Sequence, residues 1–505
     1  PEAVEITQLA LWIRSATRDQ TLATLSRNIV HGNSLVHDPE VHAAGFDWRK
    51  RFPEVFKRAP RAGGFISLEV SASPELKTEV INPSACADRG GFDCVIGNPP
   101  WERMDLSERE FFSLPAPEIA TATTGAKRQK LIDGLPKKDP ALYERYIEAG
   151  SSIDKLRAYC HTSGRYPLTG KGRTNLYAVF AELAYDLVAS HGRVGLLTPS
   201  GIASDNTTKD FFAAVAESNR LIRLFDFENR TKKLFPEVDG RFKFCILNFG
   251  GPGTKQGLAD YVFFAHSAED LDDKEKHIVL SGKDIRLLNP NTRTCPIFRT
   301  KRDAEITKAI YRRVPVLLDK NRDGPTGNPW GIRFKQGLFN QTSDSEFFKE
   351  RDWLKAEGLK PKGNRWIKGK ETYLPLYEAK MVQVYDHRAA DVVTETGNWV
   401  RQGQTAKTST VSWQNPEHLA MPRFWVSSEK VSLPDWGSLG FKDITSPTNQ
   451  RTMIAACGPL AGYTNHFILV RSELEPRTQT CLLANLNSFT YDYCTRQKIG
   501  GVTLN

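Results

Sequence analysis

Four consecutive residues, Asn98, Pro99, Pro100 and Trp101, are the best candidates for chemistry in this chain. The two prolines fix φ near −65° and remove two backbone donors, so the Asn98 side-chain oxygen and the Pro99 carbonyl remain as acceptors. Two rigid acceptors that converge on one point suit an amino group with two hydrogens, such as the exocyclic N6 of adenine. Because both hydrogens are then held, the nitrogen becomes pyramidal and its lone pair is free to attack an electrophile.

The residues on either side of this motif support that interpretation. The apolar run at 92–97 predicts a buried strand, with Cys94 as a core residue. Trp101 offers a flat face on which a base can stack, which is worth about 1–3 kcal/mol. The alternative is a strand that ends in a Pro-Pro turn beside a core tryptophan. The apolar run before the motif and the aromatic residue in it favour the first interpretation.

Strands and helices alternate around the motif. Apolar residues at helical spacing predict amphipathic helices over 4–16 and 174–188. Further patterns predict a helix near 207–218 and strands at 28–30, 192–202, 221–227 and 241–250. Residues 102–172 are polar, charged and mostly helical in character, and they interrupt the fold as an insertion. Such alternation predicts a mostly parallel sheet covered on both faces, in which ligands lie beyond the carboxyl ends of the strands.

The character of the chain changes after about residue 265. Alternation with helices fades, and Trp, Arg, Lys, Asn and Gly become common, as in KPKGNRWIKGK at 360–370. We therefore predict an α/β domain over 1–265, with its helical insertion at 102–172, and a second domain of α+β type over 266–505.

Charge and composition limit the class of protein. The chain has 505 residues, with 69 Lys and Arg against 59 Asp and Glu, a formal net charge of +10. A basic balance favours a polyanionic partner, most often nucleic acid. There is no apolar run of about 18 residues, so we expect no membrane span. The eight cysteines form no CxxC pair and no zinc spacing with histidine, which predicts reduced thiols, a cytoplasmic location and no metal site.

The motif and its surroundings resemble a known group of enzymes. GNPPW resembles the catalytic motif of S-adenosylmethionine-dependent amino-methyltransferases, written (D/N)PP(Y/F/W). Runs that resemble further motifs lie before and after it in the expected order. PEAVEITQLALWI, NIVHGNSL and FDWRKRFPEVF precede it, and GRTNLYAVFAELA, GRVGLLTPSGI and LFPEVDGRFKFCILNFG follow it. Later runs, such as LPLYEAKMVQVYDHR and LLANLNSFTYDYCTRQKIGG, resemble large DNA adenine methyltransferases. Those are the type IIG restriction–modification enzymes and the BREX and DISARM phage-defence methyltransferases, and the resemblance covers nearly the whole chain.

The resemblance implies a fold and a set of catalytic residues. The fold would be a Rossmann-like S-adenosylmethionine-dependent methyltransferase sheet, incomplete at its N-terminus, followed by a target-recognition domain. The catalytic residues would be Asn98, Pro99, Pro100 and Trp101, with the first two accepting the N6 hydrogens. The transfer is direct and in line, so we expect no covalent enzyme intermediate and no catalytic cysteine.

Aromatic residues would hold the target base. Trp101 would stack on an adenine flipped out of the duplex, since the atom to be methylated cannot be reached inside the stack. Phe235 would cover the other face of that base, with Phe242 and Phe244 as rivals. The alternative for Phe235 is a place in the core.

The cofactor S-adenosylmethionine would be bound by Asn33, Ser34 and Asn98. The alternative for Asn33 is a turn residue that tolerates a positive φ. The G-x-G turn of the first cofactor motif is absent before residue 92, and in relatives the acidic residue of the second motif would lie just upstream of Pro1. We therefore expect the chain to be a fragment of a longer protein that binds the cofactor weakly by itself.

Two further segments belong to the predicted pocket. Asn175 and Leu176 would line it, with a helix start as an equal alternative. The loop at 198–202 would lie near the base, with a plain Pro-stopped strand as its alternative. By contrast, YEAK at 377–380 looks like half of a nuclease site, but the only Pro-Asp pair, at 434–435, follows it in the wrong order, so we interpret it as structural.

Cations in the second domain would bind DNA. Lysine and arginine side chains would contact phosphates, which makes affinity salt-dependent, and other side chains would read base edges. The strongest candidates are Lys362, Arg365, Lys368, Arg388, Arg451, Arg496 and Lys498, with Lys360, Lys370, His387, Asn449 and Gln497 beside them. Each cluster by itself is more often a solvated basic face, and only the set, beside a methyltransferase domain, favours DNA.

The sequence thus predicts an adenine-N6 DNA methyltransferase of a restriction–modification or phage-defence system. Its expected partners are double-stranded DNA and other restriction or phage-defence subunits, with no membrane. Two alternatives stay open: a methyltransferase that acts on RNA or on a protein glutamine, and a DNA-binding module without catalysis of its own.

Overall fold

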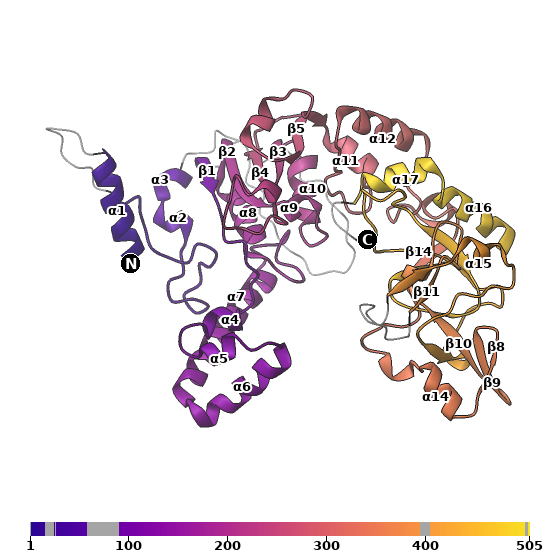
Figure 1. Cartoon of the computed structure of the whole chain (residues 1–505). Coiled ribbons are helices and arrows are strands. Elements are labelled where there is room, and N and C mark those ends of the chain that lie inside the picture. Colours follow the sequence, from indigo (N-terminus) through magenta and orange to yellow (C-terminus); the bar gives the residue numbers. More distant parts are fainter. Residues whose placement is uncertain are drawn as a thin grey trace. The chain divides into compact units, whose positions relative to one another are not determined.

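A computed structural model describes residues 2–15, 25, 27–57, 90–393, 404–499 and 503–504 of the chain. The chain divides into two compact units with mixed α/β structure (Figure 1). The first unit comprises residues 1–295 and 299–301, and the second comprises 296–298 and 302–505. Among the described residues, no helix is both long enough and apolar enough to cross a membrane.

The first unit is built on a six-stranded sheet in the order β1-β2-β4-β3-β5-β6. Its strands are β1 (Phe92–Gly97), β2 (Val188–Pro199), β3 (Leu221–Glu228), β4 (Lys243–Gly250), β5 (Ala259–Ala265) and β6 (Ile278–Leu280). The pairs β1–β2 and β3–β5 are parallel, and the pairs β2–β4, β3–β4 and β5–β6 are antiparallel. The prediction of a mostly parallel sheet is therefore wrong. The physical reason is the connection from β3 to β4, which holds only a short 3-10 turn and no crossover helix that could make the strands parallel.

The first unit also contains helices outside its helical insertion. They are α1 (Glu2–Ser15), α2 (Trp48–Arg51), α3 (Pro53–Phe56), α8 (Leu176–Leu187), α9 (Gly201–Ser204), α10 (Lys209–Glu217) and α11 (Gly282–Leu288), with 3-10 turns at Asn229–Thr231 and Ala268–Asp272. The predicted helix at 174–188 is confirmed as α8, which buries Val179 and Leu183. Helix α10 buries Phe211 and Phe212 completely, so both helices are fixed by apolar faces at helical spacing.

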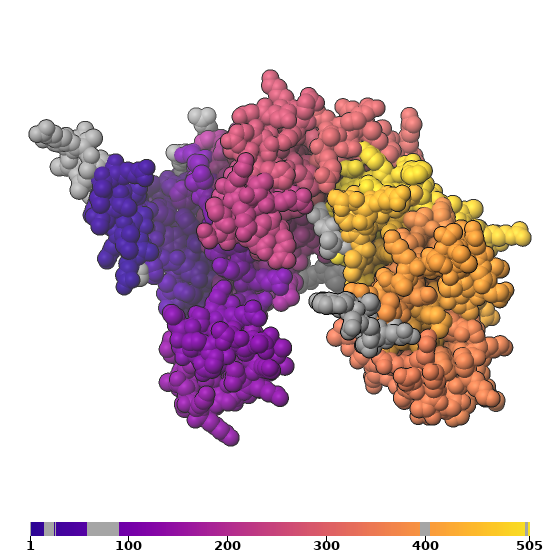
Figure 2. Space-filling model, in the orientation of Figure 1, coloured from indigo at the N-terminus to yellow at the C-terminus, as the bar shows by residue number. Residues whose placement is uncertain are grey.

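The helices predicted for the insertion are present, and they form a lobe of their own (Figures 1 and 2). They are α4 (Glu108–Phe111), α5 (Pro117–Ala120), α6 (Gly125–Lys138) and α7 (Pro140–Thr162). The lobe has a separate small core of Phe112, Ala116, Ile119, Ile132, Leu135 and Leu142. Because these apolar side chains bury one another, the lobe does not depend on the sheet for its shape.

Two predictions about the start of the chain are wrong, while the helix predicted over 4–16 is confirmed as α1. Residues 28–30 form turns rather than a strand. The strand β1 is present, but it lies at the edge of the sheet and is not fully buried: Ile96 is 85% exposed and Cys94 is exposed as well. Helix α1 is also present, but its apolar residues Ile6 and Ile13 are exposed. An apolar pattern predicts a strand or helix and does not show which of its faces the remaining chain covers.

The second unit contains three sheets. One has the order β15-β14-β17-β7, the second has β13-β10-β9-β8 with β16 beside β10, and the third pairs β11 with β12. The strands are β7 (Ile332–Gln336), β8 (Lys360–Lys362), β9 (Arg365–Lys368), β10 (Glu371–Tyr377), β11 (Ala390–Val392), β12 (Thr405–Lys407), β13 (Trp425–Ser427), β14 (Ser438–Lys442), β15 (Ala455–Gly458), β16 (Gly462–Tyr463) and β17 (Phe467–Ser472).

The helices of this unit are fewer and mostly short. They are α12 (Lys301–Arg313), α13 (Gly324–Gly327), α14 (Arg351–Ala356), α15 (Thr410–Gln414), α16 (Pro476–Leu486) and α17 (Phe489–Arg496), with 3-10 turns at Ser345–Phe347, Ala379–Met381 and Ser428–Lys430. Leu482 and Leu486 of α16 pack against Leu439 and Val470 of the first sheet. The first unit extends past the predicted boundary at 265/266, because β6 pairs with β5. The assignment of catalysis to the part before this boundary and of DNA recognition to the part after it stays a prediction.

Candidate active site

The motif Asn98, Pro99, Pro100 and Trp101 follows directly on the end of β1, where that strand runs parallel to β2. The Trp101 indole Nε1–H donates to the Asn98 side-chain oxygen at 3.0 Å. This contact orients the amide and uses one of the two lone pairs of its oxygen. Asn98 is exposed and Pro99 is buried, and the Pro99 carbonyl has no hydrogen-bond donor among the described residues. Two acceptors therefore lie next to each other in the sequence, and each has a lone pair that can accept a further hydrogen bond.

A stack of aromatic rings supports Trp101. The Trp101 ring lies over Phe244 with 6.2 Å between centroids and 29° between planes, and Phe244 in turn stacks on Phe227 at 5.2 Å and 7°. Of the rival phenylalanines, Phe244 is buried under Trp101, while Phe242 is 53% exposed. Phe235 meets Trp101 edge to face, with centroids 6.5 Å apart and 74° between planes. The structure thus brings Phe235 beside Trp101, in a T-shaped rather than a parallel arrangement.

Asn229 holds the loop that carries Phe235. Its amide donates to the Phe235 carbonyl at 2.8 Å and to the Val238 carbonyl at 3.0 Å, and its oxygen accepts from the Phe235 N–H at 3.2 Å. Asn229 is 2% exposed. Sequence reasoning missed this residue, because it lies in a polar run beside Glu228 and Arg230 and nothing in the sequence marks it as a loop anchor.

The start of α8 is tied to the residues after the motif. The Leu176 N–H donates to the Glu102 carbonyl at 3.0 Å, and the Met104 N–H donates to the Thr174 carbonyl at 3.2 Å. Asn175 lies in an antiparallel bridge with Arg103. The two pocket residues predicted from the sequence, Asn175 and Leu176, are therefore adjacent to the motif segment, and their role in a pocket stays a prediction.

Arg157 connects the insertion to the same segment. This α7 side chain donates through Nε to the Met104 carbonyl at 3.1 Å and pairs with the Asp105 carboxylate at 2.8 Å. Because Met104 is buried and Arg157 caps its carbonyl, the motif segment is held from both α8 and α7.

A buried carboxyl lies beside the predicted loop at 198–202. The Ser200 hydroxyl donates to the Asp226 carboxylate, and the Phe264 N–H donates to its other oxygen at 3.4 Å. Burial raises the pKa of Asp226, while Ser200 and the nearby Lys243 ammonium act in the opposite direction. Phe264 itself has a φ of 58°, which is rare for a bulky residue and marks backbone strain at this end of β5. Sequence reasoning did not single out Asp226.

The predicted cofactor residues lie in a turn that joins the same core. The Asn33 side-chain oxygen accepts from the Leu35 N–H at 3.1 Å, which makes a turn without a positive φ at Asn33. The amide hydrogens of Asn33 have no partner among the described residues. The Ser34 carbonyl accepts from the Trp48 indole at 3.1 Å. Leu35 packs in one cluster with Met104 and with Val179 of α8, so the turn and the motif share a core.

Most of the first unit matches a known protein family. Residues 1–235 match the Eco57I restriction-modification methylase family. The match covers the turn at Asn33, the motif at Asn98 and the loop residue Phe235, and it leaves the second unit outside. No curated protein matches the chain.

Solved structures of low similarity were also found. The type IIG restriction endonuclease BpuSI is 13% identical with a TM-score of 0.29, over 84% of this chain and 46% of that one. The type IIL restriction-modification enzyme MmeI, in complex with DNA, is 13% identical with a TM-score of 0.36, over 83% and 44%. The ATP-dependent type ISP restriction-modification enzyme LlaBIII, bound to DNA, is 7% identical with a TM-score of 0.32, over 82% and 28%. The chain spans less than half the length of these proteins.

The basic hairpin of the second unit is exposed. Strands β8 and β9 pair antiparallel through Lys362 and Arg365, and Gly363 between them has a φ of 64°, as a tight turn requires. The exposed cations of the hairpin and its flanks are Lys360, Lys362, Arg365, Lys368 and Lys370. Trp366 on the other face is buried against Trp425, so the hairpin presents its charges on a fixed scaffold.

Arg388 has a different environment from the hairpin cations. Its guanidinium donates to four backbone carbonyls within 3.5 Å, those of Trp413, Asn415, Pro416 and His418. The Trp413 indole in turn donates to Asp386 at 3.1 Å. Arg388 therefore stabilises this loop, and a contact of Arg388 itself with DNA stays a prediction.

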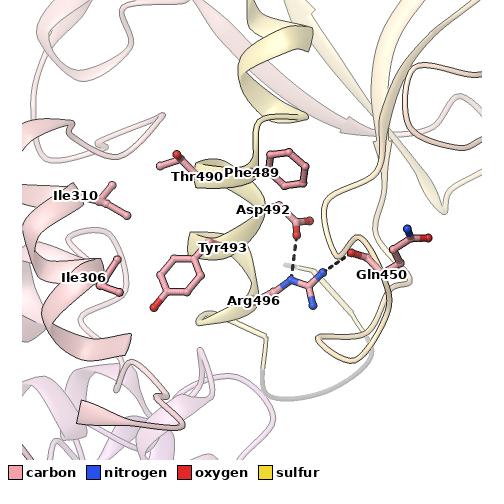
Figure 3. A pocket seen from close by; sticks show the side chains of 8 residues that line it. All are labelled: Ile306, Ile310, Gln450, Phe489, Thr490, Asp492, Tyr493 and Arg496. Atoms are coloured by element: carbon pink, nitrogen blue, oxygen red, sulfur yellow. Dashed lines mark hydrogen bonds and ion pairs between the residues drawn. The ribbon is translucent and has the colours of Figure 1, made fainter. Parts of the chain in front are cut away.

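The last three DNA-binding candidates lie close to α17. Figure 3 shows Arg496 beside Asp492, to which it donates at 2.9 Å, and it also donates to the Gln450 carbonyl at 2.7 Å. Arg451 donates to the Asn487 carbonyl and lies over the exposed Phe489 ring at 4.9 Å. The Lys498 ammonium lies 4.9 Å from the centroid of the Tyr311 ring, and the residue is exposed. These contacts give all three residues structural roles, and their DNA contacts stay predictions.

The YEAK segment forms an internal ion pair. Glu378 pairs with Lys380 at 2.7 Å and accepts from the Gln341 amide at 3.0 Å. The carboxylate thus has partners from its own unit.

Proposed function

We propose that this protein is a site-specific DNA methyltransferase that transfers a methyl group from S-adenosylmethionine to N6 of a flipped-out adenine. It would act in a restriction–modification or phage-defence system. The match of residues 1–235 to a restriction-modification methylase family supports the methylase part of this proposal. The geometry around Asn98 supports the choice of an amino group as the acceptor.

The observation that carries the proposal is the arrangement of Asn98, Pro99 and Trp101. Asn98 is exposed at the end of a strand, its amide is oriented by the Trp101 indole at 3.0 Å, and the Pro99 carbonyl beside it is unbonded among the described residues. A turn that only ends a strand does not need to hold two acceptors with free lone pairs. An amino group that enters would donate one hydrogen to each.

The residues of the chain would act on the target base as follows. S-adenosylmethionine would supply the methyl group as an electrophilic sulfonium, whose sulfur keeps the electron pair of the broken S–CH3 bond and leaves as a neutral thioether. Asn98 and Pro99 would hold the two N6 hydrogens, which directs the nitrogen lone pair toward that methyl carbon. One N6 hydrogen then leaves as a proton to water, since Asn98 is exposed. Catalysis would rest on positioning and on fixed acceptors rather than on a covalent intermediate.

Trp101 and Phe235 would hold the ring of the base. Trp101 is supported from one side by Phe244 and keeps partial exposure, as a stacking face requires. Phe235 lies edge-on at 6.5 Å, so it would border the base in this geometry and would cover its second face only after a rotation of the ring.

The described residues fit one end of the cofactor. The Asn33 amide has donor hydrogens without a partner among the described residues, and its oxygen is fixed by Leu35 at 3.1 Å, so the donors have a defined position. Donors of this kind match the ring nitrogens of an adenine. Asn33 and Ser34 would therefore hold the adenosine part, and Asn98 would border the sulfonium side.

The second unit would bind the DNA duplex. The exposed cations of the β8–β9 hairpin suit phosphate contacts, and the net charge of +10 supports a polyanionic substrate. This unit would act as the target-recognition part, and restriction or phage-defence subunits would be further partners.

The test is a methyl-transfer assay with the full-length protein, S-adenosylmethionine carrying a labelled methyl group, and three acceptors offered separately. Label in duplex DNA supports the proposal. Label only in structured RNA or in a protein glutamine would contradict it, as would DNA binding without transfer by the full-length protein.

A further inference from the structure

The charges of the helical insertion are unevenly distributed. Helix α6 has the sequence GAKRQKLIDGLPKK, with five cations and one carboxylate. Four of the cations, Lys127, Lys130, Lys137 and Lys138, are exposed. None of these four lysines has an ion-pair partner among the described residues.

The four lysines lie on one face of α6. At about 100° per residue they fall within an arc of roughly 100°, and they extend over about 16 Å of helix axis. The apolar residues Ile132 and Leu135 point the other way and are buried in the core of the lobe. We call Lys127, Lys130, Lys137 and Lys138 the lysine face.

Helix electrostatics explain only half of this face. Lys137 and Lys138 are in the last turn, where cations are favourable. Lys127 is in the first turn, where a cation is unfavourable and where α6 has no acidic residue. The first turn is thus positively charged at a cost to the helix, which indicates a function outside the lobe.

Gly134 lies in the middle of the lysine face. A Cβ at this position would meet nothing within 4 Å, and its φ is not in the left-handed region. Neither packing nor backbone conformation therefore requires a glycine there, although glycine weakens the interior of a helix relative to alanine. A bare backbone between four cations allows a flat or rigid anion to approach the helix closely.

The residues around the lysine face favour one kind of polyanion, duplex DNA, over a membrane surface. A helix that binds a membrane surface needs an exposed apolar face next to its charges. Here Ile132 and Leu135 are buried, and only Leu131, 39% exposed, lies beside the lysines. A regular array of phosphates is the anion that matches four cations along about 16 Å, since duplex DNA carries one charge per about 1.7 Å of its axis.

We propose that the lysine face of α6 is a second DNA-binding surface, which contacts the phosphate backbone from the catalytic unit. The inference rests on the proposed function in one respect, namely that the substrate is duplex DNA. It adds a contact on the helical insertion, separate in sequence from the β8–β9 hairpin. Such contacts position a duplex and carry no sequence information themselves.

The test measures DNA affinity of the full-length protein against salt concentration. The combined variant Lys127→Gln, Lys130→Gln, Lys137→Gln and Lys138→Gln should lower the slope of log K against log salt by about 3 to 4, since each phosphate contact contributes about 0.9. A matched control removes three exposed cations elsewhere on the lobe: Arg109→Gln, Arg145→Gln and Lys155→Gln. This control should leave the slope unchanged.

A second variant separates contact from charge. Gly134→Leu keeps every lysine and places a side chain in open space, so the melting temperature should not fall, while affinity for DNA should fall several-fold. The inference would be overturned if the four-lysine variant kept the wild-type salt slope. It would also be overturned if this variant lost binding to anionic vesicles and kept its binding to DNA. If the wild type transfers methyl groups to DNA and the four-lysine variant keeps the wild-type salt slope, only the inference about the lysine face is refuted. If the four-lysine variant changes the slope and the wild type transfers no methyl group to DNA, only the proposed function is refuted.

Discussion

At the scale of single residues, the hydrogen bond between Trp101 and Asn98 couples the residue proposed to stack on the base to the proposed acceptor. The bond is 3.0 Å long, and the Trp101 ring is itself held by Phe244. A change at Trp101 will therefore affect both the stacking surface and the direction of the Asn98 amide. Two substitutions of one residue can separate these effects.

Trp101→Phe keeps an aromatic face and removes the indole donor. We expect the methyl-transfer rate constant to fall by about 5- to 10-fold, the effect of one orienting hydrogen bond, with little change in KM for DNA. Trp101→Ala removes both functions and should also raise KM. Steady-state kinetics on duplex DNA measure both constants, and a Trp101→Phe variant as fast as the wild type would show that the indole does not orient Asn98.

Sequence alone led to the proposal of Asn98, Trp101 and Phe235 as site residues, because the motif and its order along the chain indicate them. It could not identify Asn229 or Asp226. Asn229 acts through three hydrogen bonds to the backbone of a loop, and Asp226 acts through a hydroxyl from another strand. Such roles depend on which residues the fold brings together, and a single polar residue in a sequence carries little sign of them.

At the scale of elements, the loop between β3 and β4 positions Phe235 through Asn229. Asn229→Ala leaves the Val238 carbonyl and the Phe235 N–H without a partner among the described residues, and it removes one of the two donors to the Phe235 carbonyl, which keeps the Val238 N–H. We expect a loss of about 1–3 kcal/mol in the free energy of unfolding and a higher KM for DNA. Arg241→Gln, in the same loop and highly exposed, is the control and should change neither by much. Denaturant unfolding measures the free energy of unfolding, and steady-state kinetics measure KM. If Asn229→Ala is as stable as the wild type, Asn229 does not anchor the loop.

Lys442, at the end of β14, gives a pH-dependent prediction. The residue is 9% exposed, and burial lowers its pKa from 10.5 to about 8. The fold therefore favours the neutral amine. The free energy of unfolding is highest above pH 10.5, falls as the pH falls from 10.5 to about 8, where only the unfolded chain takes up the proton, and is constant with respect to this group below about 8. Lys442→Met should stabilise the protein by about 2 kcal/mol at pH 7. Urea unfolding at pH 7, 8.5 and 9.5 should show this advantage shrink, and a constant advantage would contradict it.

Elements were easier to predict than their directions and exposure. Helix α8 and strands β2, β3 and β4 follow from periodicity in the sequence. The antiparallel course of β4 does not, because periodicity gives no direction. The exposure of Cys94 and Ile96 on β1 was also missed, since a strand at the edge of a sheet has the same apolar pattern as a central one.

At the scale of the whole molecule, the net charge of +10 predicts a polyanionic partner without locating its surface. The structure separates the candidate cations into two groups. Hairpin residues such as Lys362 and Arg365 are exposed, whereas Arg388 and Arg496 donate to carbonyls of their own unit. The sequence indicates both groups as candidates, and the contacts that distinguish them are seen only in the fold.

The hairpin should therefore act on binding and Arg388 on stability. Lys362→Gln with Arg365→Gln should lower the salt slope of DNA binding by about 2, with an unchanged melting temperature. Arg388→Gln should lower the melting temperature, because four carbonyls lose the guanidinium as a donor and only the Asn415 carbonyl keeps another, the His418 N–H, among the described residues. Fluorescence anisotropy over a range of salt concentrations and thermal unfolding measure the two effects. Should the hairpin variant keep the wild-type slope, the hairpin does not contact phosphates.

The identity of the methylated base tests the central claim most directly. Duplex DNA treated with the full-length protein and S-adenosylmethionine is digested to nucleosides, and the products are separated and identified by mass spectrometry. We predict N6-methyladenine with the wild type and none with Asn98→Ala, whose fold is unchanged by circular dichroism. A methylated cytosine in its place, or N6-methyladenine at the wild-type level with Asn98→Ala, would contradict the account.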